Sequence, residues 1–178
     1  MNKASKQRIK DLELQTLKAK HPTIDERFIP LTAWNDSTAN GLTKCIVSFI
    51  NMSGGYAERI NTMGTYKQAK QVKDLDGITR TVGKGKYIPS GSTKGSADIS
   101  STIPVVIHGL ELGLSVKWEV KMKDRQSEEQ KKYEEATKKA GGHYYIVRSF
   151  DEFLEYYDEI IKPVWRDNNS PRTTTLTD

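Results

Sequence analysis

The spacing of apolar side chains along this chain alternates between the period of an α-helix and the period of a β-strand. Apolar residues three and four positions apart, together with polar residues that can cap a helix, predict helical segments. The second of these can be capped by Asp36-Ser37 or by Ser37-Thr38, and His21-Pro22 and Pro163 lie beyond the ends of two others. The expected helices are residues 4–20, 37–51, 128–140 and 150–161.

Between these helices, apolar residues recur at every second position, as in half-buried strands. In residues 56–61 this spacing places Tyr56, Glu58 and Ile60 on one face. From residue 36 onward the order is helix, three strands, helix, strand, helix, which predicts an α/β domain with a central mixed β-sheet flanked by helices. The expected strands are 56–61, 104–107, 114–121 and 143–148, with 108–113 joining the second to the third.

The predicted elements divide the chain into three parts. Residues 1–35 form a helical arm and an extended connector, and residues 36–165 form the main domain. The arm is expected to pack on the domain or on a second subunit, with a free basic helix lying on DNA as a less favoured third option. Residues 166–178 are expected to be a disordered tail. A homodimer is possible by analogy at the level of fold alone.

A long segment rich in glycine and in basic residues precedes the second predicted strand. Residues 64–95 contain six glycines, and six basic residues lie between Lys67 and Lys86. We expect a mobile loop or hairpin there. The sequence leaves two roles open for it, a solvated surface loop or a clamp that follows the phosphates of a DNA backbone.

Composition narrows the class of protein. Hydrophobic residues make up 35% of the 178 residues and charged residues 29%, which is compatible with one globular domain and flexible ends. The formal net charge of +5 favours a polyanionic partner. The sole cysteine, Cys45, excludes an internal disulfide, and no run of 18 apolar residues exists. We therefore expect a cytoplasmic protein that does not associate with a membrane.

Three charged residues form the pattern with the clearest chemical meaning. Glu119 and Lys121 occupy alternate positions of an apolar strand, so their side chains share one face. If Asp98 lies beside that strand, two carboxylates meet at about 4 Å, where a cation must lie between them for both to stay charged at low cost. Mg²⁺ prefers oxygen ligands and keeps waters that can be activated. A salt bridge between Glu119 and Lys121 is the alternative, but it leaves Asp98 unexplained.

Several motifs in a fixed order surround these residues: Gly95-Ser96-Ala97-Asp98, Glu119-Val120-Lys121, Ser127-Glu128-Glu129-Gln130 and the run from Gly141 to Ser149. Together, over about 38–157, they resemble the VRR-NUC branch of the PD-(D/E)XK nuclease superfamily, which includes small nucleases of phages and mobile elements. The resemblance implies a PD-(D/E)XK nuclease-like fold and Mg²⁺- or Mn²⁺-dependent cleavage of DNA, often at branched or flapped structures.

The resemblance also implies roles for individual residues. Asp98 and Glu119 would bind the metal, with the Val120 carbonyl as a further ligand, and Lys121 would be the catalytic lysine. In related nucleases a glutamine in the following helix orients phosphate or lysine. Gln130 has that position, although it can also close a capping box with Ser127.

Further residues are expected around this site. Tyr133, one helical turn after Gln130, either extends the site or packs against it. Basic side chains nearby are expected to hold the DNA backbone without reading bases, helped by the positive end of a helix. The expected nucleic-acid-binding residues are Arg59, Lys84, Lys86, Lys123 and Arg125.

The chain departs from many relatives in the helix predicted at 37–51, where they carry a glutamate that also binds metal. No acid follows Asp36 in this stretch, and Asn40 could bind a metal only through its carbonyl oxygen or a water. Fewer anionic ligands weaken metal binding. The alternative to a DNA endonuclease is therefore a non-catalytic DNA-binding or assembly module with a nuclease-like fold. Cleavage of RNA is a third reading that these residues leave open.

Overall fold

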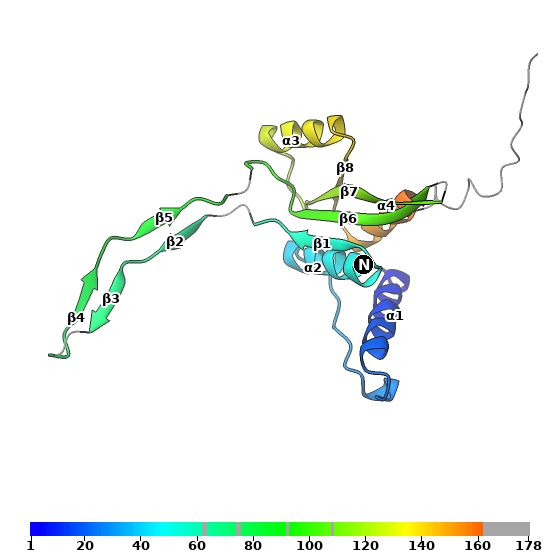
Figure 1. Cartoon of the computed structure of the whole chain (residues 1–178), viewed down its shortest axis with the longest axis horizontal. Coiled ribbons are helices and arrows are strands. Elements are labelled where there is room, and N and C mark those ends of the chain that lie inside the picture. Colours follow the sequence, from blue (N-terminus) through cyan, green and yellow to red (C-terminus); the bar gives the residue numbers. More distant parts are fainter. Residues whose placement is uncertain (62–63, 74–75, 92, 108, 162–178) are drawn as a thin grey trace, which may run out of the picture.

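A computed structural model describes residues 1–61, 64–73, 76–91, 93–107 and 109–161, which form a mixed α/β architecture around one four-stranded sheet (Figure 1). The predicted α/β class and mixed sheet are therefore confirmed. The elements in chain order are α1 (Lys3–Lys20), η1 (Glu26–Phe28), α2 (Ala39–Met52), β1 (Tyr56–Arg59), β2 (Thr65–Lys67), β3 (Lys70–Lys73), β4 (Thr79–Val82), β5 (Lys86–Ile88), β6 (Ile99–Ile107), β7 (Leu110–Val120), α3 (Glu128–Lys139), β8 (His143–Val147) and α4 (Phe150–Ile161).

The main sheet has the strand order β1-β6-β7-β8. β1, β6 and β7 pair antiparallel, and β8 pairs parallel to β7. A parallel pair needs a crossover connection, and α3 supplies it. Helices α2 and α4 lie on one side of the sheet and α3 lies on the other (Figure 1). The sheet therefore has a core face, covered by α2 and α4, and an α3 face.

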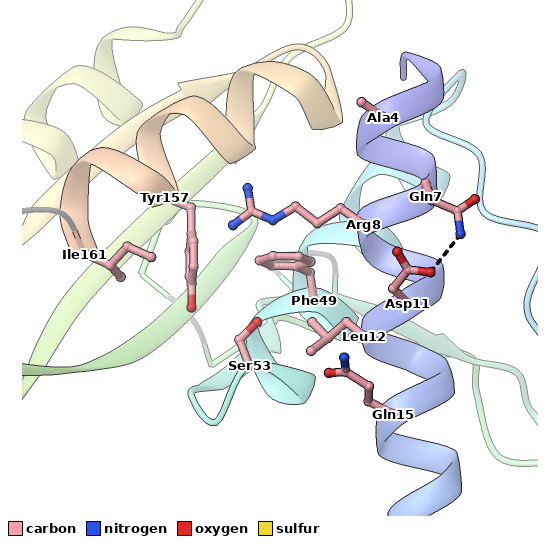
Figure 2. A pocket seen from close by; sticks show the side chains of 10 residues that line it. All are labelled: Ala4, Gln7, Arg8, Asp11, Leu12, Gln15, Phe49, Ser53, Tyr157 and Ile161. Atoms are coloured by element: carbon pink, nitrogen blue, oxygen red, sulfur yellow. Dashed lines mark hydrogen bonds between the residues drawn. The ribbon is translucent and has the colours of Figure 1, made fainter.

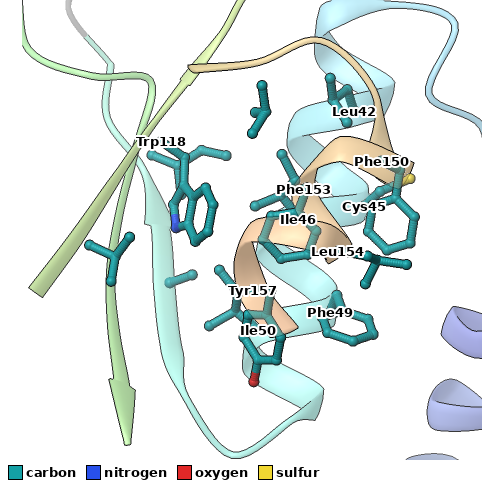
Figure 3. Packing of buried hydrophobic residues seen from close by; sticks show 14 of the residues in the cluster. Leu42, Cys45, Ile46, Phe49, Ile50, Trp118, Phe150, Phe153, Leu154 and Tyr157 are labelled. Carbon is teal, nitrogen blue, oxygen red and sulfur yellow. The ribbon is translucent and has the colours of Figure 1, made fainter. Parts of the chain in front are cut away.

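The hydrophobic core lies between the sheet and the pair α2 and α4. Alternate residues of β6 and β7, such as Ile99 and Trp118, point into it and are fully buried. The Trp118 ring meets Phe153 of α4 with centroids 4.9 Å apart, and Phe49 of α2 contacts Phe153 edge to face (Figure 3). Burial of such large apolar side chains contributes roughly 1.5–3 kcal/mol each, so this cluster fixes the position of β7.

The N-terminal helix belongs to the same core. Ile9 of α1 is 0% exposed and packs in the cluster formed with α2 and α4. The buried carboxylate of Glu13 accepts hydrogen bonds from the Thr32 amide and hydroxyl and from the Trp34 indole, which attaches the connector to α1. Of the three placements considered for the arm, packing on the domain is the observed one.

Two predicted boundaries need correction. Helix α2 begins at Ala39 rather than residue 37, with Thr38 as its cap, so the Ser37-Thr38 option is the observed one. Asp36 instead accepts a hydrogen bond from the Phe150 amide at the start of α4. The predicted connection 108–113 is largely strand, because Leu110–Gly113 continue β7 opposite β6. The antiparallel register, once set, extends to the hairpin tip through backbone hydrogen bonds whatever the side-chain pattern.

The basic segment before β6 forms a hairpin that projects from the sheet, with β2 paired to β5 and β3 paired to β4 (Figure 1). The hairpin option for this segment is thus the observed one. His108, Pro163 and the tail 166–178 lie outside the described residues. Within the part of the chain that is described, no helix is both long enough and apolar enough to cross a bilayer.

Candidate active site

The register of β6 and β7 brings the two predicted carboxylates together. Ile99 pairs with Trp118, so one further step along the antiparallel register sets Asp98 opposite Glu119. Directly opposed residues of such a pair point to the same face, here the α3 face, and Lys121 shares it two residues later. The structure therefore brings together Asp98, Glu119 and Lys121, as the sequence predicted.

Asp98 is held rigidly at the point where the chain enters β6. Its Oδ2 accepts a hydrogen bond of 2.9 Å from the Val120 amide, and its backbone carbonyl accepts one of 2.7 Å from Ile60. Its other oxygen, Oδ1, has no hydrogen bond within the described part of the chain. The carboxylate is therefore fixed in direction while one oxygen stays available to a ligand.

Glu119 is only 1% exposed, and three side chains donate to its carboxylate. The Gln130 amide nitrogen lies 2.5 Å from Oε1, the Lys121 ammonium 3.1 Å from Oε1, and the Tyr144 hydroxyl 3.3 Å from Oε2. Burial raises the pKa of Glu119, and the negative charge of Asp98 raises it further, while Lys121 acts in the opposite direction. A buried carboxylate beside a second acid is an environment that a bound cation would stabilise.

Gln130 fills both of the roles expected for it. Its side-chain oxygen accepts from the Ser127 amide at 2.9 Å, and its own amide hydrogen bonds to the Ser127 hydroxyl, so the capping box of α3 is complete. Because the carbonyl end of the side chain is used in the cap, the NH₂ end faces Glu119. The start of a helix therefore orients a donor toward the buried carboxylate.

Gly95 explains how the segment carrying Asp98 reaches this helix. Its φ of +81° lies in the left-handed region, and a Cβ built there would lie 2.5 Å from the backbone carbon and oxygen of Glu129. Only glycine satisfies both conditions without strain. Beside it, Lys94 forms a 2.8 Å ion pair with Glu129, which joins the same two segments at the surface.

The oxygen atoms around Asp98 and Glu119 suit a divalent metal ion. In an extended strand the N–H and C=O of one residue point to the same side, and the Val120 N–H points to Asp98, so the Val120 carbonyl faces that side too. Two carboxylates and a carbonyl fit Mg²⁺ or Mn²⁺, which accept oxygen ligands and retain waters. Among the described residues, no group of three or more His, Cys, Asp or Glu side chains could hold an ion.

The missing helix acid is not replaced from elsewhere. Asn40 is exposed in the first turn of α2, and none of the hydrogen bonds among described residues joins it to Asp98 or Glu119. Glu58 of β1 lies opposite Ser100 and thus on the α3 face, where it accepts a 3.4 Å hydrogen bond from Tyr56. Since neither Asn40 nor Glu58 supplies a third acid, Asp98 and Glu119 form the anionic part of the site.

The predicted phosphate-binding residues lie in three places. Lys123 and Arg125 are exposed between β7 and α3, next to the carboxylate pair. Arg59 is exposed but pairs with Ile99, so its side chain starts on the core face, away from Glu119; its predicted place at the site needs this correction. Lys84 and Lys86 lie on the projecting hairpin.

Two residues of the site were missed by the sequence. Tyr144 donates to Glu119 and lies against the Tyr133 ring of α3, so Tyr133 extends the site through it. Lys117, two residues before Glu119 on the same face, is half-buried and donates to Ser100. Alternation along the strand could have identified Lys117, whereas Tyr144 depends on the pairing of β8 with β7.

A separate pocket of about 750 Å³ lies between α1, α2 and α4 (Figure 2). Arg8 enters it, but its guanidinium forms a two-point ion pair with Asp158 and lies over the Phe49 ring. On the same helix, α1, Gln7 hydrogen bonds to Asp11 (Figure 2). These polar groups satisfy one another, so the pocket offers no comparable chemistry.

Neither a protein-family model nor a curated protein matches this chain.

Proposed function

We propose that this chain is a Mg²⁺- or Mn²⁺-dependent DNA endonuclease with a PD-(D/E)XK nuclease-like fold, acting on branched, flapped or otherwise structured DNA. The observation that carries the proposal is Glu119, a carboxylate that is 1% exposed, opposite Asp98 in the sheet register and 3.1 Å from Lys121. A purely structural ion pair would need Lys121 alone. The second acid, with one oxygen left available, is what a phosphodiesterase site requires.

The residues divide the chemistry between them. Asp98, Glu119 and the Val120 carbonyl would hold the ion, which when bound supplies Lewis acidity to a phosphodiester and to water. Lys121 places a positive charge where negative charge develops on the phosphate. Gln130 and Tyr144 hold the Glu119 carboxylate in orientation.

The sheet supports the nuclease-like fold on which this proposal draws. An acid lies at the start of β6, and a Glu-x-Lys lies at the end of its hairpin partner β7. The crossover helix α3 then returns a donor to the same place before the parallel strand β8. The half-buried Lys117, which forms no ion pair among the described residues, adds a cation for the phosphate backbone on this face.

The test is cleavage of labelled single-stranded, duplex, flap and four-way-junction DNA and of RNA, with Mg²⁺ or Mn²⁺. Lys121→Ala should lower the cleavage rate by roughly 100-fold or more, because it removes charge that acts in the transition state. Lys132→Ala on the exposed surface of α3 is the charge-matched control and should cleave as the parent does. Equal rates for both variants, or no cleavage of any substrate, would contradict the proposal.

One observation favours the non-catalytic binding module as a second candidate. Glu119 is already neutralised by Lys121, and the described residues provide two acids rather than three. Calorimetric titration with Mn²⁺ separates the two candidates, because the enzyme requires binding that Glu119→Ala abolishes. DNA binding with no detectable metal binding would select the module instead.

A further inference from the structure

The projecting hairpin forms a single two-stranded ribbon, which we name the basic ribbon and define as residues 64–73 and 76–88. Every residue of β2, β3, β4 and β5 is exposed, so the ribbon packs on no core. It leaves the main sheet after β1 and returns at Asp98, and at its base the Ile60 amide bonds to the Asp98 carbonyl. A single extended ligand can therefore contact both the ribbon and the carboxylate site.

The basic ribbon carries most of the net charge of the chain. Residues 65–88 contain six basic and two acidic side chains, a net charge of +4, against +5 for all 178 residues. Five exposed lysines of this segment form no ion pair within the described part of the chain. These are Lys67, Lys70, Lys73, Lys84 and Lys86.

The arrangement of these charges is unfavourable in the free protein. Lys67 and Lys86 lie directly opposite each other in the register of β2 and β5. Like charges at directly opposed positions destabilise a strand pair, and among the described residues no acid forms an ion pair with either lysine. An isolated two-stranded ribbon is itself marginally stable. A polyanion bound along these lysines would remove the repulsion. The opposition of Lys67 and Lys86 is therefore the observation that identifies a polyanion as the partner.

The ribbon is nonetheless shaped by specific backbone features. The rings of Tyr66 and Tyr87 lie over Gly85 and Gly64, where an added Cβ would clash with them. Two residues separate Lys67 from Lys70, whereas three separate their pairing partners Lys86 and Val82. The second strand therefore has one extra residue, as in a β-bulge, and Gly83 in this stretch has a φ of +83°. A bulge increases the twist of a strand pair, and a twisted ribbon can follow a helical groove.

We propose that the basic ribbon binds the phosphate backbone of a nucleic acid duplex that flanks the carboxylate site. This rests on the proposed function for the identity of the polymer. Nine residues from β2 to the end of β3 extend roughly 30 Å, close to one turn of B-DNA at about 34 Å. A two-stranded ribbon also fits the major groove, which is about 12 Å wide. The ribbon thus contacts duplex over about one turn beside the carboxylate site.

The test measures duplex binding in EDTA, so that it does not depend on catalysis. Fluorescence anisotropy of a 30-base-pair duplex is recorded from 50 to 200 mM salt for the parent and for Lys67→Gln/Lys86→Gln. Each phosphate contact contributes about −0.9 to the slope of log K against log salt, so the double variant should flatten the slope by about 2.

Lys3→Gln/Lys6→Gln on α1 is the control with the same loss of charge, and its slope should equal that of the parent. Equal slopes for the ribbon variant and this control, no duplex binding by the parent, or a change of oligomeric state in the ribbon variant would overturn the ribbon proposal. Ribbon-dependent binding without metal-dependent cleavage would overturn the nuclease and leave the ribbon proposal standing. Cleavage without ribbon-dependent binding would overturn the ribbon proposal and leave the nuclease standing.

Discussion

Glu119 is surrounded by groups that act on its charge in opposite directions. Burial and the neighbouring Asp98 raise its pKa, whereas Lys121 and the Tyr144 hydroxyl favour the charged form. A cation between the two carboxylates would stabilise this arrangement. It would offset both the repulsion between Asp98 and Glu119 and the cost of burying the Glu119 charge. Protons and metal ions therefore compete for one side chain, whose direction is fixed by its three donors.

Gly95 is the residue at which backbone conformation limits the site. Gly95→Ala should destabilise the fold by more than the roughly 1–2 kcal/mol of left-handed strain, because its Cβ also meets the Glu129 backbone. It should also lower cleavage, since the displaced segment carries Asp98. Gly109→Ala is the matched control, with a φ of +79° and no atom within 4 Å of the added Cβ. Chemical denaturation and cleavage rates check both, and equal losses for the two variants would contradict the close-approach argument.

Cys45 gives a residue-scale prediction that depends on pH. Burial raises the pKa of its thiol to about 11, and the thiol donates to the Asn35 carbonyl, 3.7 Å away. At pH 8 about one thiol in a thousand is then ionised in the folded state, so the native protein should resist alkylation by iodoacetamide. Reactivity should appear on unfolding, or as pH rises toward the raised pKa. Rapid labelling of the native protein at pH 8, followed by mass spectrometry, would show that the thiol is accessible.

At the scale of the element, α3 performs two tasks through its first turn. The capping box satisfies backbone donors that would otherwise be unpaired, and the same Gln130 side chain reaches Glu119. The helix also crosses from β7 to β8 over the α3 face, where it leaves β6 and β7 exposed beyond the site. A helix start thus couples local stability to the orientation of a candidate metal ligand.

These two tasks can be separated by mutation. Ser127→Ala removes the cap and should cost about 1 kcal/mol of unfolding free energy with a small effect on cleavage. Gln130→Ala also breaks the box, but it removes the donor to Glu119 and should lower metal affinity or cleavage by about 10- to 100-fold. Thermal melting and calorimetry with Mn²⁺ measure the two effects. A loss of metal affinity that is equal in both variants would assign Gln130 to the cap alone.

At the scale of the whole molecule, α1 and its connector belong to the folded unit that presents the site. The buried Glu13 carboxylate holds Thr32 and Trp34, and Asp36 at the end of the connector caps α4. Through α2 and α4, these contacts support the core face beneath Trp118 and hence the strand that carries Glu119. The basic ribbon is the opposite case, since it projects from the sheet and its stability is independent of this core.

Ile9 tests the contribution of α1. Ile9→Ala should destabilise the protein by about 2–5 kcal/mol, because the side chain is 0% exposed within a packed cluster. Leu14→Ala, at a half-buried position of the same helix, should cost clearly less and controls for helix propensity. Denaturant melts of both variants provide the comparison. Similar small losses would place α1 outside the cooperative core.

The sequence alone determined the features that depend on near neighbours in the chain. The cap at Ser127, the helical and strand periods and the shared face of Glu119 and Lys121 follow from local geometry, and the structure confirms them. The hairpin within 64–95 was one of two local options. Of the two cap options at the start of α2, the one at Ser37-Thr38 is confirmed. The one at Asp36 is wrong, because a tertiary contact with Phe150 uses that carboxylate.

Only the tertiary structure decided which distant residues meet. The β6–β7 register sets Asp98 opposite Glu119, and the parallel crossover brings Tyr144 to the same carboxylate. The burial of Ile9 and the opposition of Lys67 to Lys86 also depend on pairings that no local pattern specifies. Side-chain period fixes the face on which a residue points, whereas strand register and helix packing fix its partner, and the chemistry proposed here depends on the partner.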